Sequence, residues 1–155
     1  MSKIFKKLQL QQTDKSLEPW RSAKLSLLPK RGWIRTLRTS LGMPLKVLGE
    51  RLGITSAGVS KLEKSEASGT ITLNSLRKIA DALDCELEYA LIPKTSLKEM
   101  REQQATKQAQ EQIGAVSHSM MLAGQEVDQA SHQLIFEELV KELLDGNDKR
   151  LWKNV

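Results

Sequence analysis

The segment from Thr55 to Lys64, TSAGVSKLEK, combines small polar side chains with two lysines at helical spacing. If it is a helix, Val59 and Leu62 lie on one face and the small and cationic residues lie on the other. Those outward residues are Ser56, Ala57, Ser60, Lys61 and Lys64. Hydroxyl and ammonium groups donate hydrogen bonds to base edges and phosphates, and short side chains let a helix enter a groove about 12 Å wide. The segment therefore predicts contact with duplex DNA.

A tight turn must position this helix against the one before it. Gly49 falls where the preceding helix has to approach closely, and Gly53 permits a sharp reversal of the backbone. The Thr55 hydroxyl can accept a hydrogen bond from free backbone N–H groups and start the helix. We expect a helix that ends at Gly53 and a second one from Thr55 to about Lys64. The inward anchors of the second helix are Ile54, Val59 and Leu62.

Apolar residues recur at intervals of three and four along most of the chain, which favours a mainly α fold. The other expected helices cover 3–27 as one or two pieces, 31–42, 73–83, 95–122 and 127–144. Residues 65–72 are expected to form a loop. The stretch CELEYALI, 85–92, alternates apolar and polar residues, which indicates one short strand over 86–92. It could pair with a symmetry mate or serve inside the molecule.

Three regions follow from this pattern. We expect an N-terminal helical arm over 1–29, a DNA-binding domain over 30–93, and a C-terminal helical extension over 94–155 for dimer or partner contact. Trp20 and Trp33 lie on apolar stripes and are expected in the core. The apolar face of the last long helix is too wide for a solitary helix to hide, so a second subunit or a partner protein is expected to cover it. That face comprises Leu134, Ile135, Leu139, Val140, Leu143 and Leu144.

The net charge of +5 is unevenly distributed. Residues 1–64 hold 14 Lys and Arg against 4 acids, whereas residues 65–155 hold 10 against 15. The first half, at +10, attracts polyanions over long range, and salt screens that attraction. A solvated basic surface would have the same composition, so the charge supports the helical motif without replacing it.

Several other classes of protein lack support in the sequence. The single cysteine, Cys85, cannot form an internal disulfide, which points to a reducing cytosol. No run of 18 apolar residues could span a membrane, and glutamines interrupt the basic N-terminus where a signal peptide would be apolar. We therefore expect a cytoplasmic protein. His118 and His132 lack metal-site spacing, and no phosphate loop or nucleophile elbow occurs, so we expect no metal, no cofactor and no enzyme activity.

Glu63 has a structural interpretation. An acid on the inward side of the 55–64 helix can tie it to a basic helix, with Arg35 or Arg38 as candidate partners. A functional carboxylate is the alternative.

The stretch from Leu41 to Leu83, LGMPLKVLGERLGITSAGVSKLEKSEASGTITLNSLRKIADAL, resembles the Cro/C1-type (Xre) helix-turn-helix family. The resemblance implies a lambda-repressor-like DNA-binding domain. The chain departs from the family pattern at Leu45, where a polar Gln is common, and at Ser56, where a longer polar residue is common. Gly58 also weakens its helix by roughly 1 kcal/mol relative to Ala. These departures predict either modest base readout or base readout that depends on docking to order the helix.

A larger part of the chain, roughly 15–125, is similar to the family named mobile mystery protein A. The segments that carry this resemblance are RGWIRTLRTSLGMPLKVLGERLG, GTITLNSLRKIADALDCELEYALIP and VSHSMMLAGQ. The resemblance implies an antitoxin encoded beside a Fic-domain toxin, a fold that commonly transfers AMP to proteins. The segment TSLKEM, 95–100, places Glu99 where Fic-inhibiting helices carry a glutamate, although Met100 replaces their Gly or Asn. Steric blocking by the C-terminal helices is a rival mode of inhibition.

The sequence thus predicts a homodimeric transcriptional repressor that binds a double-stranded operator, autoregulates its operon and neutralises a Fic-type toxin. The alternative is a stand-alone phage- or plasmid-type regulator without a toxin partner. The predicted base contacts are Ser56, Ala57, Ser60 and Lys61. The predicted phosphate contacts are Arg31, Arg38, Lys46, Arg51, Thr55 and Lys64. The predicted toxin contacts are Glu99, Leu134 and Leu139.

Overall fold

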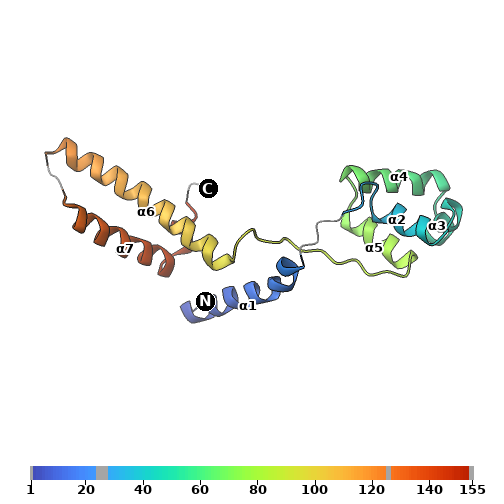
Figure 1. The fold of residues 1–155 in the computed structure, drawn as a ribbon, viewed down its shortest axis with the longest axis horizontal. Helices are drawn as coiled ribbons and strands as arrows, with labels where there is room; N and C mark the ends of the chain where they lie inside the picture. Colours follow the sequence, from blue (N-terminus) through green and yellow to red (C-terminus); the bar gives the residue numbers. More distant parts are fainter. Residues whose placement is uncertain (1, 24–27, 125–126, 154–155) are drawn as a thin grey trace. The chain divides into compact units, whose positions relative to one another are not determined.

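The computed structural model describes residues 2–23, 28–124 and 127–153, and it is mainly helical (Figure 1). Residues 23–91 form one compact unit, and residues 1–22 form a second unit with 92–155. The helices are α1 (Lys3–Ser22), α2 (Trp33–Ser40), α3 (Leu45–Leu52), α4 (Ser56–Ser68), α5 (Leu73–Ala82), α6 (Leu97–Leu122), α7 (Gln129–Asp145) and α8 (Asp148–Leu151). None of these helices combines the length and apolar content that a membrane span requires.

Helices α2 to α5 enclose a single apolar core. Each helix contributes at least one side chain that is nearly or fully buried, and Leu83 closes the core after α5. The buried residues are Ile34, Leu48, Val59, Ile79 and Leu83. Leu62 packs against this cluster, so two of the three expected anchors of α4 are confirmed. The third, Ile54, is wrong as a core anchor because its side chain is 40% exposed in the turn.

The turn between α3 and α4 follows the local signals in the sequence. Gly53 has a left-handed φ of 68° and ends α3, and the Ile54 N–H donates to the Gly49 carbonyl at 2.8 Å. Thr55 caps α4, because its Oγ1 accepts a hydrogen bond from the Gly58 N–H at 3.1 Å. A Cβ on Gly49 would lie 2.6 Å from the Ile54 carbonyl oxygen. The close approach expected at Gly49 is therefore confirmed.

Three sequence predictions for this unit are wrong. Helix α4 continues to Ser68 instead of ending at Lys64, and Gly69, at a φ of 77°, ends it. The segment 85–92 is not a strand, because no neighbouring strand within the described residues supplies hydrogen bonds to it. Trp33 is 49% exposed at the start of α2 and does not belong to the core, whereas Trp20 is half-buried.

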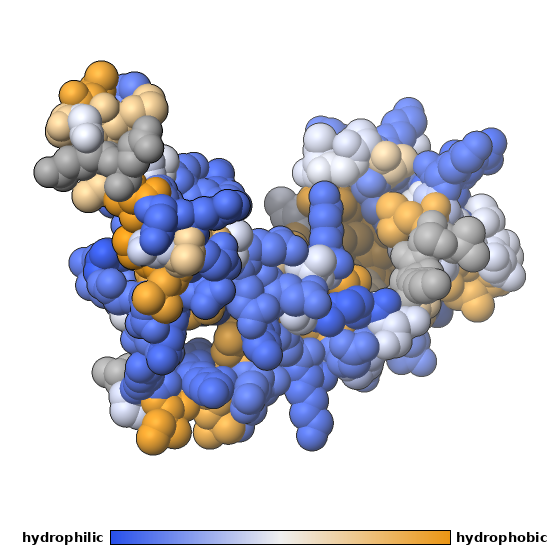
Figure 2. Space-filling model, turned by 60° about the vertical axis from the view of Figure 1, so that its left-hand side comes forward, coloured by the Kyte–Doolittle hydropathy of each residue, from blue (hydrophilic) through white to orange (hydrophobic). Residues whose placement is uncertain are grey.

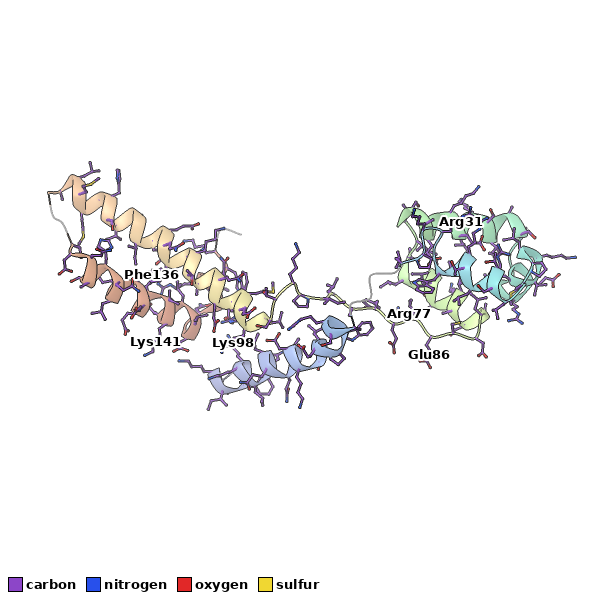
Figure 3. All side chains as sticks on the ribbon, in the orientation of Figure 1. Arg31, Arg77, Glu86, Lys98, Phe136 and Lys141 are labelled. Atoms are coloured by element: carbon purple, nitrogen blue, oxygen red, sulfur yellow. The ribbon has the colours of Figure 1, made fainter. Side chains whose placement is uncertain are left out.

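In the second unit, α6 and α7 pack against each other along small residues. Ala105 and Ala109 of α6 are fully buried and let Leu143 of α7 approach closely. Figure 3 shows Phe136 directed from α7 toward α6, and this side chain packs on the same cluster. The expectation that α7 needs an outside partner to cover its whole apolar face is therefore wrong, since α6 covers much of it.

Helix α1 packs on α6 instead of forming an arm of its own. The Asp14 carboxylate accepts hydrogen bonds from the Leu97 and Lys98 N–H groups at 2.7 and 3.2 Å, so α1 caps the start of α6. At the other end of α1, Lys6 donates to Asp148, as does Arg101 of α6. These two bonds hold the pKa of Asp148 below its usual range. The residues expected beyond α1 at 24–27 lie outside the described residues.

The geometry around Gly49 predicts opposite effects for the same substitution at two glycines of this unit. We expect Gly49→Ala to lower the free energy of unfolding by about 1–3 kcal/mol, because the new methyl group collides with backbone. Gly58→Ala is the matched control. Its Cβ would meet neighbouring side chains at an ordinary 3.4 Å, and it should raise the free energy of unfolding by up to about 1 kcal/mol. Urea denaturation followed by circular dichroism measures both, and equal effects would contradict the close approach.

Candidate nucleic-acid interface

The outward face of α4 is lined with short and cationic side chains. Ser56, Ala57, Lys61 and Lys64 are exposed, and Ser60 is half-buried at the edge of this face. Because α4 is longer than expected, Ala67 and Ser68 extend the same face by another turn, and both are exposed. Sequence reasoning missed this extension, although Gly69 was a signal for where the helix ends. The face offers donors and little steric bulk.

The inward face of α4 carries a buried ion pair with α2. Arg38 Nε donates to Glu63 Oε1 at 2.5 Å, and Arg38 Nη2 lies 3.3 Å from Glu63 Oε2. Arg38 Nη1 also donates to the Met43 carbonyl at 2.9 Å. The two side chains are only 11% and 7% exposed. The structural interpretation of Glu63 is confirmed, and the assignment of Arg38 to a phosphate is corrected, because its guanidinium is already committed.

A second acid on α4 caps the beginning of α2. The Glu66 carboxylate accepts hydrogen bonds from the Trp33 and Ile34 N–H groups at 2.7 and 2.9 Å. A negative group here also complements the partial positive charge at a helix N-terminus. Gly32 leaves room for it, since a Cβ at that position would lie 2.6 Å from Glu66 Oε2. Sequence reasoning missed this contact because Glu66 was placed in a loop.

The remaining residues that were predicted to contact phosphates differ in their exposure and in whether their donor groups already have partners. Lys64 and Arg31 are exposed, and Arg31 lies two residues before the start of α2. The Lys46 side chain is 80% exposed, and its ammonium group lies 4.0 Å from Glu50 Oε1, which is a weak contact. This ammonium group is therefore available to a phosphate. Arg51 is exposed but donates to the Ala82 carbonyl at 2.9 Å, which ties α3 to the end of α5. The Thr55 oxygen accepts the α4 cap bond and can still donate its own proton.

The two histidines and Glu99 lie outside the helix-turn-helix unit. Within the described ranges no group of three or more His, Cys, Asp or Glu could hold a metal ion. His118 is exposed, and His132 Nε2 lies 3.2 Å from the Ser117 hydroxyl of α6. Glu99 is exposed in the first turn of α6, where its N–H donates to the Ser96 hydroxyl at 3.1 Å.

Two short helices joined by a glycine turn, with an anchored second helix that presents a thin outer face, define a helix-turn-helix DNA-binding domain. Residues 34–89 match the family model described as helix-turn-helix. This match supports the predicted likeness to Cro/C1-type helix-turn-helix domains over these residues, and it suggests that the domain binds DNA in transcription regulation. Neither the curated proteins nor the solved structures contain a match to the chain.

The buried ion pair predicts a large cost for removing one charge. We expect Glu63→Gln to lower the free energy of unfolding by about 3 kcal/mol, because it leaves the Arg38 charge buried without a counter-ion. Glu50→Gln is the control, since its contact with Lys46 is exposed and should contribute about 0.5 kcal/mol or less. Urea denaturation of both variants measures the difference. A Glu63→Gln variant as stable as the control would show that the pair does not hold α4.

Proposed function

We propose that the protein is a sequence-specific transcriptional repressor that binds an operator through the outward face of α4. The observation that carries this proposal is the combination of two exposed lysines with small exposed side chains on a helix whose other face is fully anchored. An ammonium group attracts phosphate, and short neighbours let the helix axis come close to base edges. The charge of residues 1–64 adds long-range attraction to the duplex.

The proposed complex is symmetric. A homodimer would place two copies of α4 in successive major grooves about 34 Å apart, over an inverted repeat. Ser56, Ala57, Ser60 and Lys61 would meet base edges, and Ala67 and Ser68 extend that surface. Lys46, Lys64 and Arg31 would meet phosphates, with Thr55 and the free donors of Arg51 beside them. Binding over its own promoter would block transcription.

The small side chains limit how much sequence each helix can read directly. A bidentate contact discriminates against a wrong base by about 1–3 kcal/mol, and serine cannot form the bidentate pairs that Arg, Asn or Gln form. The proposal therefore assigns part of the specificity to the shape and deformability of the operator. Affinity would depend mainly on the lysines, and it would fall as the salt concentration rises.

Neutralising the lysines of α4 tests this assignment. We expect Lys61→Gln with Lys64→Gln to weaken binding to the promoter duplex and to reduce the slope of log K against log salt by at least about 1, since the Lys64 contact with a phosphate contributes about 1. A fluorescence titration at several salt concentrations measures both quantities. The control is Lys107→Gln with Lys141→Gln, which removes the same charge from exposed positions of α6 and α7. Equal losses in the two double variants would refute the α4 interface.

We further propose that the protein is the antitoxin of a Fic-domain toxin. The resemblance to mobile mystery protein A supports this role, and so does apolar surface that remains uncovered on α7. Leu134 and Ile135 are 62% and 51% exposed, whereas Leu139 is half-buried against α6. Figure 2 shows orange apolar residues on this unit among mostly hydrophilic ones. Leu134 is the central contact in this proposal, with Leu139 at its edge and Glu99 as the candidate inhibitory acid.

Co-expression with the Fic-domain protein encoded in the neighbouring reading frame tests this second role. We expect Leu134→Glu with Ile135→Glu to abolish protection against the toxin, because buried carboxylates at the contact would lack partners. Promoter binding should stay unchanged, since these residues do not belong to the helix-turn-helix domain. Glu99→Ala separates the two modes of inhibition. Loss of protection favours an inhibitory glutamate, and retained protection favours steric blocking. Full protection by both variants would place the toxin contact elsewhere or leave a stand-alone regulator.

A further inference from the structure

The chain leaves the helix-turn-helix unit as an extended segment after α5. Asp84, at a φ of 56°, turns the backbone, and the Cys85 N–H donates to the Ala80 carbonyl at 2.8 Å. From residue 86 to residue 91 no backbone group forms a hydrogen bond with any described residue. Figure 1 shows this stretch as an open trace beyond α5. A sequence with strand-like alternation therefore presents its backbone donors and acceptors without partners.

The side chains of this segment are also unusually exposed for their type. Tyr89 is 59% exposed and Leu91 is 89% exposed, while Leu87 is half-buried. These three residues share one face of an extended chain, and Glu86 and Glu88 share the other. An unpaired extended segment with an apolar face is a ready template for another strand. Pro93 limits such a strand on its C-terminal side, because it has no N–H to donate.

We propose that residues 86–91 pair antiparallel with the same residues of a second copy of this chain, with Tyr89 opposite Tyr89 on the two-fold axis. In this register Leu87 lies opposite Leu91, so the apolar faces of both strands form one continuous surface. Glu88 lies opposite Ala90, and no glutamate faces its own copy. Two identical segments thereby pair the backbone groups along their facing edges and place their leucines side by side on one face.

The charges disfavour the neighbouring register that is centred on Glu88. A shift that places Glu88 on the axis brings two carboxylates directly opposite each other, which is destabilising. A shift of one strand by one residue places Tyr89 opposite Glu88, which mixes the apolar face with the acidic face. An isologous contact of this kind closes at two copies and does not extend into a filament. The segment is therefore self-complementary as a dimer contact.

This inference rests on the proposed function for its purpose, because reading an inverted repeat requires two helix-turn-helix units. It deepens that proposal by naming the contact that joins them. The two-stranded pair would follow α5 directly, so few residues separate it from the DNA-reading unit of each copy. On this proposal α6 and α7 remain available for a different partner.

Disulfide trapping of the full-length chain tests the register. In a Cys85→Ser background, Tyr89→Cys places two thiols opposite each other, within the Cα separation that a disulfide allows. The matched control is Leu91→Cys, which is at least as exposed but lies opposite residue 87 of the second copy. We expect Tyr89→Cys to form at least about tenfold more covalent dimer than Leu91→Cys under mild oxidation. Light scattering of the unmodified chain should give the mass of two 17.4 kDa chains.

The outcomes separate this inference from the proposed function. A monomeric chain, or equal cross-linking at residues 89 and 91, would overturn the strand pairing. If such a chain still bound promoter DNA through Lys61 and Lys64, the DNA-binding proposal would stand. A dimer that cross-links selectively at residue 89 but does not bind the promoter duplex would support the pairing and overturn the DNA-binding proposal.

Discussion

The arrangement of the DNA-binding unit depends on two carboxylates that α4 directs inward. Glu63 forms a buried pair with Arg38, and Glu66 caps the first turn of α2. A buried charge without its partner costs several kcal/mol, so the Glu63 contact permits few other positions for α4. The half-buried Glu66 adds a second attachment through its two hydrogen bonds. Together they fix α4 against both ends of α2, since Arg38 also donates to the Met43 carbonyl beyond that helix. Hydrophobic contact alone would hold α4 less specifically.

This constraint explains how the outer face of α4 can consist mainly of short side chains. A helix that must enter a groove cannot use bulky outward side chains to hold its place, and α4 also contains Gly58, which lowers its intrinsic stability. Its anchoring therefore comes from the inward face, where Val59, Glu63 and Glu66 are spaced by four and three residues. The Thr55 cap adds about 1 kcal/mol at the end nearest the turn. Stability and recognition are thus assigned to opposite faces of one helix.

Local signals predicted most of this unit from the sequence, and long-range contacts account for what was missed. Gly53 and Thr55 act within one turn of the chain, so the α3–α4 boundary followed from residue types alone. The Glu66 cap joins residues more than thirty positions apart and could not be read from spacing. Arg38 could be named as a partner of Glu63, but only burial decides whether an arginine is structural or free for phosphate. The alternation of apolar and polar residues over 86–91 could be seen in the sequence. Whether such a segment forms a strand depends on a second strand to pair with, which the sequence of this segment does not reveal.

A single α4 can provide only limited affinity and base specificity for DNA. The rest of the chain must therefore compensate for both. Its serines can contribute only modest discrimination, and two lysines give an affinity that physiological salt reduces. Joining two such units makes the second binding event intramolecular, which can raise affinity by factors of about 10² to 10⁴ without a new base contact. That gain is lost if the linkage cannot span successive grooves. Because the side chains of the recognition helix are short, the specificity of DNA binding depends on the geometry of the dimer. A segment just after α5 is well placed to set that geometry.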